Sequence, residues 1–189
     1  MRSRLGMYRS LVTDNIILRK RLIDIGQVDA EVCRRYGGTG PVIRGAGVAY
    51  DVRRSEPYSV YPRFDFEIPV YPEGDCMARY LVRMAEIEQS LRIVEQGLEL
   101  LPEGPVMAEK VPRTIKPPAG DYCYAVEAAR GRFAVRLVSD GKDTPYRLKL
   151  RTPSFSNLSL FEEASRGMML TDALALLGSL DLVIPDIDR

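Results

Sequence analysis

Residues 74–101 read GDCMARYLVRMAEIEQSLRIVEQGLELL, and this stretch decides the fold class of the 189-residue chain. From Met77 onward, hydrophobic residues recur every three or four positions, which is the spacing of a helix with one apolar face. Asp75 precedes the pattern with a side chain typical of a helix N-cap, and Pro102 follows it with a ring that ends helices. We therefore expect a long helix over residues 72–101, about seven turns in length, that serves as a central rod.

The residues before this helix divide into two parts. Residues 1–40 are expected to form N-terminal helices, one over residues 8–22 and one over residues 29–36, where two glycines follow and end the second helix. Residues 41–71 are rich in Gly, Pro and Tyr, and they alternate between polar and apolar only briefly, at FDFEIPV. This composition predicts an extended segment with at most one strand.

The residues after the long helix predict a small sheet and two more helices. Residues 102–120 are rich in proline and are expected to form a linker. Residues 121–189 begin with three alternating runs, YCYAVEAARG, RFAVRLVSDG and PYRLKLRTPSF, which predict an antiparallel meander. So small a sheet needs the helices against one of its faces. Final helices are expected over residues 157–166, with Asn157 as the N-cap, and over residues 170–180. The expected fold class is α+β, mainly helical, in one compact domain.

Composition excludes several classes of function. Lys and Arg number 27 and Asp and Glu number 26, so the formal charge of +1 gives no field that would attract nucleic acid. Histidine, the commonest metal ligand and general base, is absent. Cys33, Cys76 and Cys123 form no CxxC pair, and we expect reduced, buried thiols rather than a metal site. No window has the length of uncharged apolar residues that a membrane span requires.

Five motifs in one order carry a family resemblance. They are GPVIRGAGVAYDVRRSEPYSVY, GDCMARYLVRMAEIEQSLRIV, LVSDG, PYRLKLRTPSFSNL and the final GSLDLVIPDIDR. Together they resemble the carboxyl-terminal half of the 49 kDa subunit of respiratory complex I, which in bacteria is the D subunit of NADH:quinone oxidoreductase. The resemblance runs over almost the whole chain, from Tyr8 to Arg189.

That family is related to the large subunit of nickel-iron hydrogenases, so the resemblance implies a hydrogenase-like carboxyl-terminal fold. In hydrogenases a DPCxxC motif near the carboxyl end holds the metal pair. Here Asp181 matches the leading acid, whereas Val183 and Asp186 stand where the two cysteines would be. Because a nickel-iron centre needs soft thiolate ligands, we expect this chain to bind no metal.

The resemblance implies that the emptied metal cavity has become part of a quinone chamber beside an iron-sulfur cluster. It assigns Asp181 and Asp186 as catalytic, and it places Val183, Asp188 and Arg189 along the chamber or the cluster edge. Carboxylates next to an apolar wall suit the reduction and protonation of a quinone. The structural alternative is that Asp181 and Asp188 pair with arginines of the long helix and hold the terminus in place.

Four arginines are candidates for contact with partner subunits. Arg44 and Arg53 lie in the segment rich in Gly and Tyr, and Arg79 and Arg83 lie one turn apart on the long helix. A solvated, salt-bridged surface is the alternative for each of them.

The resemblance also implies that the chain works in an assembly and binds no cofactor itself. Quinone would be the substrate, while the iron-sulfur cluster, flavin and NADH would belong to partner subunits. The expected partners are other complex I subunits, among them the cluster-bearing subunit and the amino-terminal half of the family's subunit. Three explanations for the missing half are left open: a split gene, a truncated paralogue or an excised domain. We expect a peripheral complex on the cytoplasmic side of the cell membrane. A non-catalytic assembly or scaffold paralogue and a subunit of an F420-dependent dehydrogenase remain alternatives.

Overall fold

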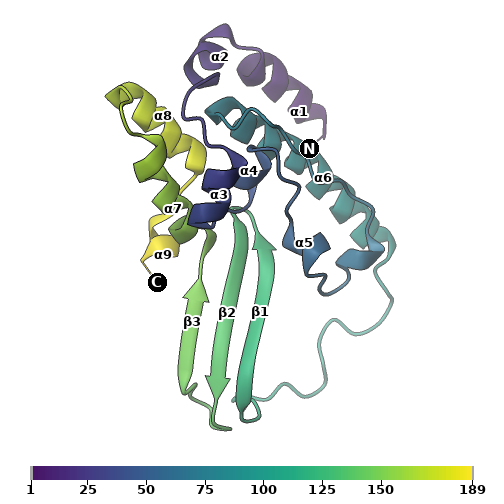
Figure 1. Cartoon of the computed structure of the whole chain (residues 1–189). Coiled ribbons are helices and arrows are strands. Elements are labelled where there is room, and N and C mark those ends of the chain that lie inside the picture. Colours follow the sequence, from purple (N-terminus) through teal and green to yellow (C-terminus); the bar gives the residue numbers. More distant parts are fainter. Residues whose placement is uncertain (1, 189) are drawn as a thin grey trace.

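The computed structural model describes residues 2–188, and within them it shows a mixed α+β fold (Figure 1). The expected fold class is therefore confirmed. The elements in chain order are α1 (Arg2–Tyr8), the π-helical turn η1 (Arg9–Thr13), α2 (Ile16–Leu22), α3 (Ala30–Tyr36), α4 (Pro41–Arg44), α5 (Val52–Ser55), the 3-10 turn η2 (Tyr61–Arg63), α6 (Cys76–Glu99), β1 (Gly120–Ala128), β2 (Gly131–Ser139), β3 (Arg147–Arg151), α7 (Pro153–Ala164), α8 (Leu170–Leu180) and α9 (Ile184–Ile187).

The three strands form the predicted antiparallel meander, in the order β1-β2-β3. Ala134 of β2 lies opposite both Ala125 of β1 and Arg151 of β3, so all three strands are in register at that level. Figure 1 shows the helices gathered at one end of the sheet, with the strands projecting beyond them.

The sheet was expected to pack one of its faces on the helices, and in the structure this packing lies at the helix-proximal end of the sheet. There Ala125 and Ala134 are buried against Val52 of α5. Farther along β1, Tyr122 and Tyr124 remain exposed. The small residues at the helix end allow close approach, whereas the large side chains beyond it stand in solvent.

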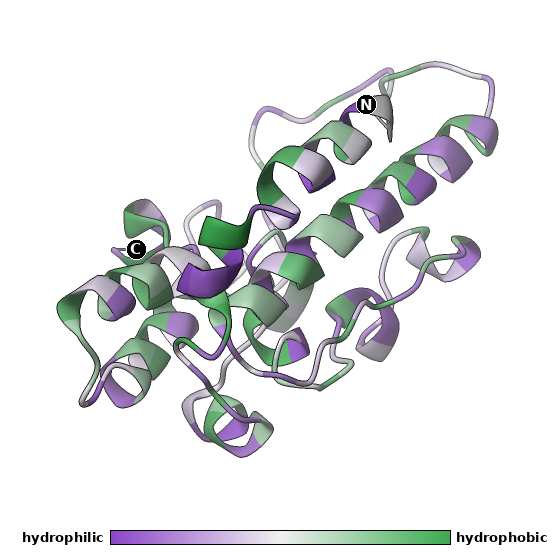
Figure 2. Cartoon of the chain, turned by 90° about the horizontal axis from the view of Figure 1, so that it is seen from above, coloured by the Kyte–Doolittle hydropathy of each residue, from purple (hydrophilic) through white to green (hydrophobic). Residues whose placement is uncertain are grey.

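The long helix α6 begins as predicted. The Asp75 carboxylate accepts hydrogen bonds from the backbone N–H of Ala78 at 2.7 Å and of Asp24 at 2.8 Å, so one side chain caps α6 and holds the loop between α2 and α3. The last buried residue of the helix is Val82, and Val94 is exposed even though it continues the apolar spacing. Figure 2 shows hydrophobic and hydrophilic residues mixed along the whole of α6.

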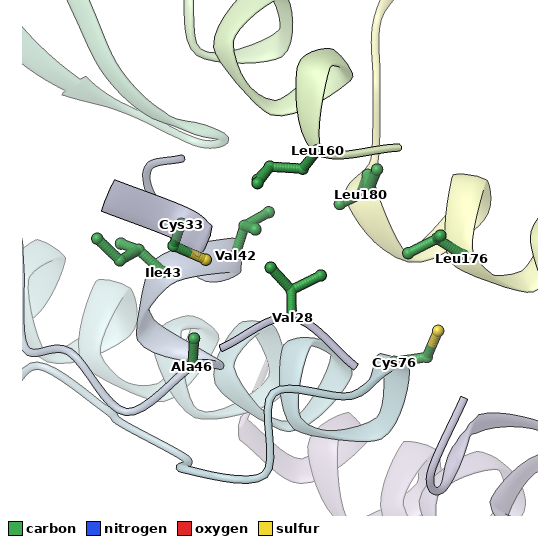
Figure 3. Close-up of a cluster of buried hydrophobic side chains, with 9 residues drawn as sticks. All are labelled: Val28, Cys33, Val42, Ile43, Ala46, Cys76, Leu160, Leu176 and Leu180. Atoms are coloured by element: carbon green, nitrogen blue, oxygen red, sulfur yellow. The ribbon is translucent and has the colours of Figure 1, made fainter. Parts of the chain in front are cut away.

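The main hydrophobic core joins helices that are distant in sequence (Figure 3). It consists of Val28, Cys33, Val42, Ile43, Ala46, Cys76, Leu160, Leu176 and Leu180. Two of the cysteines are thus buried as predicted, and burial raises the pKa of the Cys33 thiol to about 11. Cys123 is exposed, contrary to the prediction, because it lies on the projecting part of β1.

Several local predictions are corrected by the structure. The predicted helix over residues 8–22 is interrupted, and Asn15 caps the new helix α2 by accepting from the backbone N–H of Ile17. The stretch FDFEIPV forms no strand, and residues 41–71 contain short helices instead. The helix α3 agrees with the prediction, with Asp29 as its cap and Gly37 in the left-handed conformation after it.

The helix α7 starts earlier than expected, at Pro153, and α9 was not predicted. Asn157, which suggested a cap, is buried inside α7, where its side chain accepts from the Thr39 N–H at 3.0 Å. The sequence alone does not distinguish an asparagine that binds a distant backbone group from an asparagine that caps a helix.

Candidate functional site

A pocket of about 450 Å³ opens between α2, α6 and α8. Its lining combines apolar residues with hydroxyl, guanidinium and carboxylate groups. The lining residues are Leu22, Cys76, Tyr80, Arg83, Ala175, Gly178, Ser179 and Asp181. The pocket therefore brings the predicted residue Asp181 together with the predicted residue Arg83, from segments almost a hundred positions apart.

Asp181 ends α8 in the left-handed conformation, with φ of 53° and ψ of 51°. Aspartate tolerates this conformation better than most residues, so it can serve as the C-terminal cap. The Arg130 Nε donates to the Asp181 carbonyl oxygen at 2.7 Å, and Arg130 Nη2 lies 3.3 Å from Asp181 Oδ1. This double contact fixes the turn that holds the carboxylate at the pocket, and the sequence alone did not indicate Arg130.

Arg83 is the second charged group of the pocket. Its Nε lies 4.0 Å from Asp181 Oδ2, and its Nη1 donates to the Arg79 carbonyl at 3.2 Å. The Nε is buried and has no hydrogen-bond partner in the described part of the chain. Burial lowers the pKa of the Arg83 guanidinium, and the Asp181 carboxylate opposes that shift. The Arg83 side chain as a whole is 26% exposed and lines the pocket, so its guanidinium charge acts on groups there.

Arg79 forms the support behind the pocket and is completely buried, with 0% of its surface exposed. Its Nη1 and Nη2 donate to the carbonyls of Gly74 at 2.8 Å and Gly26 at 2.9 Å. Its Nε donates to the Ser179 hydroxyl at 2.9 Å. One side chain of α6 thus binds α8, the segment just before α6 and the loop between α2 and α3. The expectation that Arg79 faces a partner is wrong, since the chain itself encloses it.

Tyr80 brings a hydroxyl group to the same pocket. Its oxygen lies 2.8 Å from the Thr13 hydroxyl, and either group can be the donor. The pair also joins η1 to α6. Tyr80 was not among the predicted site residues, and no local feature of the sequence distinguished it.

Among the described residues, the predicted residues Val183, Asp186 and Asp188 do not line this pocket. Asp186 accepts from the Ser154 N–H at 3.0 Å and, through its carbonyl, from the Thr152 hydroxyl, so it caps the start of α7 from outside the helix. Val183 is half-buried, and its N–H donates to the Ser154 hydroxyl at 3.4 Å.

Asp188 and Arg189 complete the predicted set. Asp188 is exposed, and among residues 2–188 no ion pair connects it to Arg79 or Arg83. The prediction for Arg189 lies outside the described residues. The structural alternative therefore holds in part for Asp181, which pairs with Arg130 and approaches Arg83.

The two remaining arginines point into the chain. Arg44 is only 1% exposed, which rules out contact with a partner surface and corrects that expectation. Arg53 forms two hydrogen bonds to Asp51 through separate nitrogens, and its guanidinium lies 4.8 Å from the centre of the Phe66 ring. Both arginines therefore hold the fold together.

Comparison with known proteins gives the family. The family model described as respiratory-chain NADH dehydrogenase, 49 kDa subunit, matches residues 1–117 and 109–189. The chain belongs to this 49 kDa subunit family.

Curated relatives of the 49 kDa subunit family agree with this assignment. The chain is 73% identical to a NADH-quinone oxidoreductase D subunit of Opitutus terrae, the one numbered 2, over 100% of the chain and 47% of the relative. It is 64% identical to the NADH-quinone oxidoreductase D subunit of Desulfotalea psychrophila and 52% identical to that of Syntrophobacter fumaroxidans, again over 100% of the chain and over 51% of each relative. The chain thus spans about half the length of these relatives.

Two further properties describe this member of the 49 kDa subunit family. Within residues 2–188, no group of three or more His, Cys, Asp or Glu side chains is arranged to hold a metal ion. In the same part of the chain, no helix combines the length and the apolar character needed to cross a bilayer.

Proposed function

We propose that this chain forms one wall of the quinone-reduction chamber of a complex I-like NADH:quinone oxidoreductase. The observation that carries the proposal is the pocket of about 450 Å³ in which Asp181, Arg83 and Tyr80 meet. That volume lies within the range of small-molecule sites, and Leu22 and Ala175 provide apolar wall beside the polar groups. A quinone headgroup needs this combination of apolar contact and a few polar anchors.

The three polar residues have distinct roles in this proposal. Arg83 would stabilise the negative charge that develops on a quinone oxygen during reduction, because its guanidinium lines the pocket and its side chain is 26% exposed. Tyr80 would donate a hydrogen bond from its hydroxyl. Asp181, held by Arg130, would keep the Arg83 guanidinium in place and charged.

The rest of the reaction requires partner subunits. Electrons would reach the quinone from an iron-sulfur cluster on a neighbouring subunit, while NADH and flavin would be bound elsewhere in the assembly. The predicted catalytic role of Asp186, and the predicted places of Val183, Asp188 and Arg189 at the chamber or the cluster edge, belong to this proposal. Asp186 could act only if it released its contacts at the start of α7.

Exposed apolar side chains support the need for partners. Large hydrophobic residues of η1, α2 and α8 stand in solvent, and such surface is usually covered by another protein. They include Leu11 at 62%, Ile16 at 63%, Ile17 at 70%, Leu170 at 77% and Leu174 at 60% exposure. We propose that the remainder of the subunit and the cluster-bearing subunit cover these faces, and that the assembly lies on the cytoplasmic side of the cell membrane.

The decisive experiment replaces Asp181 in the assembled complex. Asp181→Asn should lower NADH:quinone turnover by about 10-fold to 100-fold, because a misplaced Arg83 no longer meets the developing charge. Transfer from NADH to a water-soluble acceptor that does not use the chamber should be unchanged, and so should recovery of the complex. Asp140→Asn, in an exposed turn where Asp140 pairs with Lys142, is the matched control.

Normal quinone turnover by Asp181→Asn in a fully assembled complex would contradict the proposed role of the pocket. If the complex also tolerated loss of Arg83 and Tyr80, the scaffold alternative would account for the chain better.

A further inference from the structure

A second group of charged residues lies outside the pocket, around Arg44. Its Nη1 is 2.9 Å from Glu127 Oε1 and 3.7 Å from Asp51 Oδ2, and its Nη2 is 2.6 Å from Glu86 Oε1. The side chains of Arg44, Asp51 and Glu127 are exposed by 2%, 1% and 4%. The group therefore joins α4, α6, β1 and the residue before α5 in the interior.

The charges in this group do not balance. Three carboxylates, of Asp51, Glu86 and Glu127, face Arg44, and one further guanidinium, of Arg53, binds Asp51 at 2.6 Å. If every group were ionised, the group would carry one excess negative charge away from bulk water. Such a charge is costly to keep in an interior, and protonation of one carboxylate removes the cost.

The hydrogen bonds show which carboxylate takes the proton most readily. Asp51 accepts hydrogen bonds from the Nε, the Nη2 and the backbone N–H of Arg53, which favour its charged form. The pKa of Asp51 is lowered by these bonds despite burial. Glu127 uses both oxygens, toward Arg44 and the Val52 N–H. Glu86 Oε1 accepts no directed hydrogen bond in the described chain, although it lies close to Arg44.

Glu86 is also the carboxylate that water can reach. Its side chain is 18% exposed, and it lines a pocket of about 200 Å³. The other residues of that lining are Arg44, Arg53, Ser90, Glu127, Ala128 and Ala129. The pocket gives a proton a short route between solvent and the interior group.

We propose that Glu86, together with Glu127 across Arg44, forms a proton-binding site that holds one proton in the folded chain and exchanges it with water through this pocket. Burial raises the pKa of both Glu86 and Glu127, while the Arg44 guanidinium opposes the shift. The charged groups that face Glu86 are Arg44 from α4, Asp51 and Arg53 at α5, Glu127 from β1 and Arg83 from α6 itself.

The site has a consequence for the first pocket. Arg83 lies three residues before Glu86 on α6 and faces both Glu86 and Asp181. A proton bound at Glu86 removes one negative charge beside Arg83, so Arg83 then acts more strongly on any anion in its pocket. The proton site itself does not depend on the quinone proposal, because its evidence comes only from the group around Arg44.

The test is a carboxyl titration of the full 189-residue chain labelled with ¹³C at the glutamate carboxyl carbon. One resonance, absent in Glu86→Gln, should titrate at higher pH than glutamate carboxyls of the same chain unfolded in urea. Glu88→Gln, two positions along α6 with an exposed side chain paired to Arg9, is the matched control and should retain that resonance. Glu127→Gln should lower the midpoint of the Glu86 resonance, because the competing carboxylate is gone.

Coincidence of the Glu86 midpoint with that of the unfolded chain would overturn the proposal, and so would a midpoint that Glu127→Gln leaves unchanged. If Glu86→Gln fails to fold, Glu86→Asp, prepared with the label at the aspartate carboxyl carbon instead, keeps a carboxyl group at the site. The carboxyl resonance of that variant must then also titrate at a higher pH than the same carboxyl group in the unfolded chain. A midpoint equal to that of the unfolded chain would equally reject the site. Neither result bears on turnover by Asp181→Asn, so the two proposals can fail separately.

Discussion

Two arginines of this chain are equally buried and have opposite surroundings. Arg44 is 1% exposed and faces three carboxylates, whereas Arg79 is 0% exposed and binds two carbonyls, a hydroxyl and the Cys76 sulfur. Burial lowers the pKa of the Arg79 guanidinium. A buried guanidinium thus needs acceptors for its N–H groups, and these acceptors need not be anions.

The difference separates two uses of a buried charge. Around Arg44 the carboxylates outnumber the guanidiniums by one, so one carboxylate is available to bind a proton. Beside the pocket, Arg79 and Arg83 lie one turn apart on α6. The Asp181 side chain, which is 43% exposed, offsets their positive charge only in part. At the pocket two guanidiniums, of Arg83 and Arg130, approach one carboxylate, of Asp181, which is the reverse of the imbalance around Arg44.

The largest effect is expected from Arg44→Met. This change leaves Asp51, Glu86 and Glu127 in the interior without their common cation, and breaking a buried ion pair typically costs about 3–5 kcal/mol. Urea unfolding of the full chain, followed by circular dichroism, measures the loss. Arg147→Met on the exposed strand β3 is the matched control. A loss below about 1 kcal/mol would mean that the carboxylates do not depend on Arg44.

A smaller loss is expected from Arg79→Met. It leaves the carbonyls of Gly26 and Gly74 without donors but no charge unpaired, so the cost should be about 2–3 kcal/mol. Arg79→Lys should recover part of it, because a lysine keeps a donor but not the planar fork. The same unfolding assay applies. Equal losses for Arg79→Met and Arg44→Met would remove the distinction between the two sites.

The third prediction concerns the pH dependence of Glu86→Gln. Since the pKa of Glu86 is raised on folding, its stabilising contribution is complete below the pKa of the unfolded chain and is lost as the pH rises through the folded pKa. Over that interval the free energy of unfolding should fall less steeply in Glu86→Gln than in the wild type. Unfolding curves at a series of pH values give the slopes, and identical slopes would show that Glu86 titrates normally.

The smallest effect is expected at an exposed pair. Arg9 Nη2 lies 2.8 Å from Glu88 Oε1, with side chains exposed by 57% and 46%. Such pairs contribute about 0.2–1 kcal/mol to the free energy of unfolding, so Arg9→Met should be nearly neutral in the same assay. Any loss should be smaller still at high salt. A loss as large as that of Arg79→Met would show that burial does not set the scale of these effects.

The sequence predicted the elements whose signals are local. Asp75 and the apolar spacing after it indicated the start and length of α6, and the alternating runs indicated the three strands. The expectation of an extended segment over residues 41–71 missed the short helices α4 and α5, each of four residues. The prediction that Asn157 caps a helix was wrong because its partner, Thr39, is distant in the chain. The division of the chain into five segments stays a prediction.

The candidate site was only partly visible in the sequence. Asp181 was found by resemblance, whereas Tyr80 and Arg130 were missed because nothing local distinguishes a pocket residue from a surface residue on an amphipathic helix or in a hairpin turn.

The sequence by itself determined the family, the long helix, the meander and the lack of histidine, because periodicity, capping residues and motif order are properties of neighbouring positions. Only the tertiary structure decided that Arg44 and Arg79 lie inside the molecule, that one faces an excess of carboxylates, and that Asp181 meets Arg83. The ionisation and reach of a charged side chain depend on which distant groups pack around it. Composition and spacing along one chain do not contain that information.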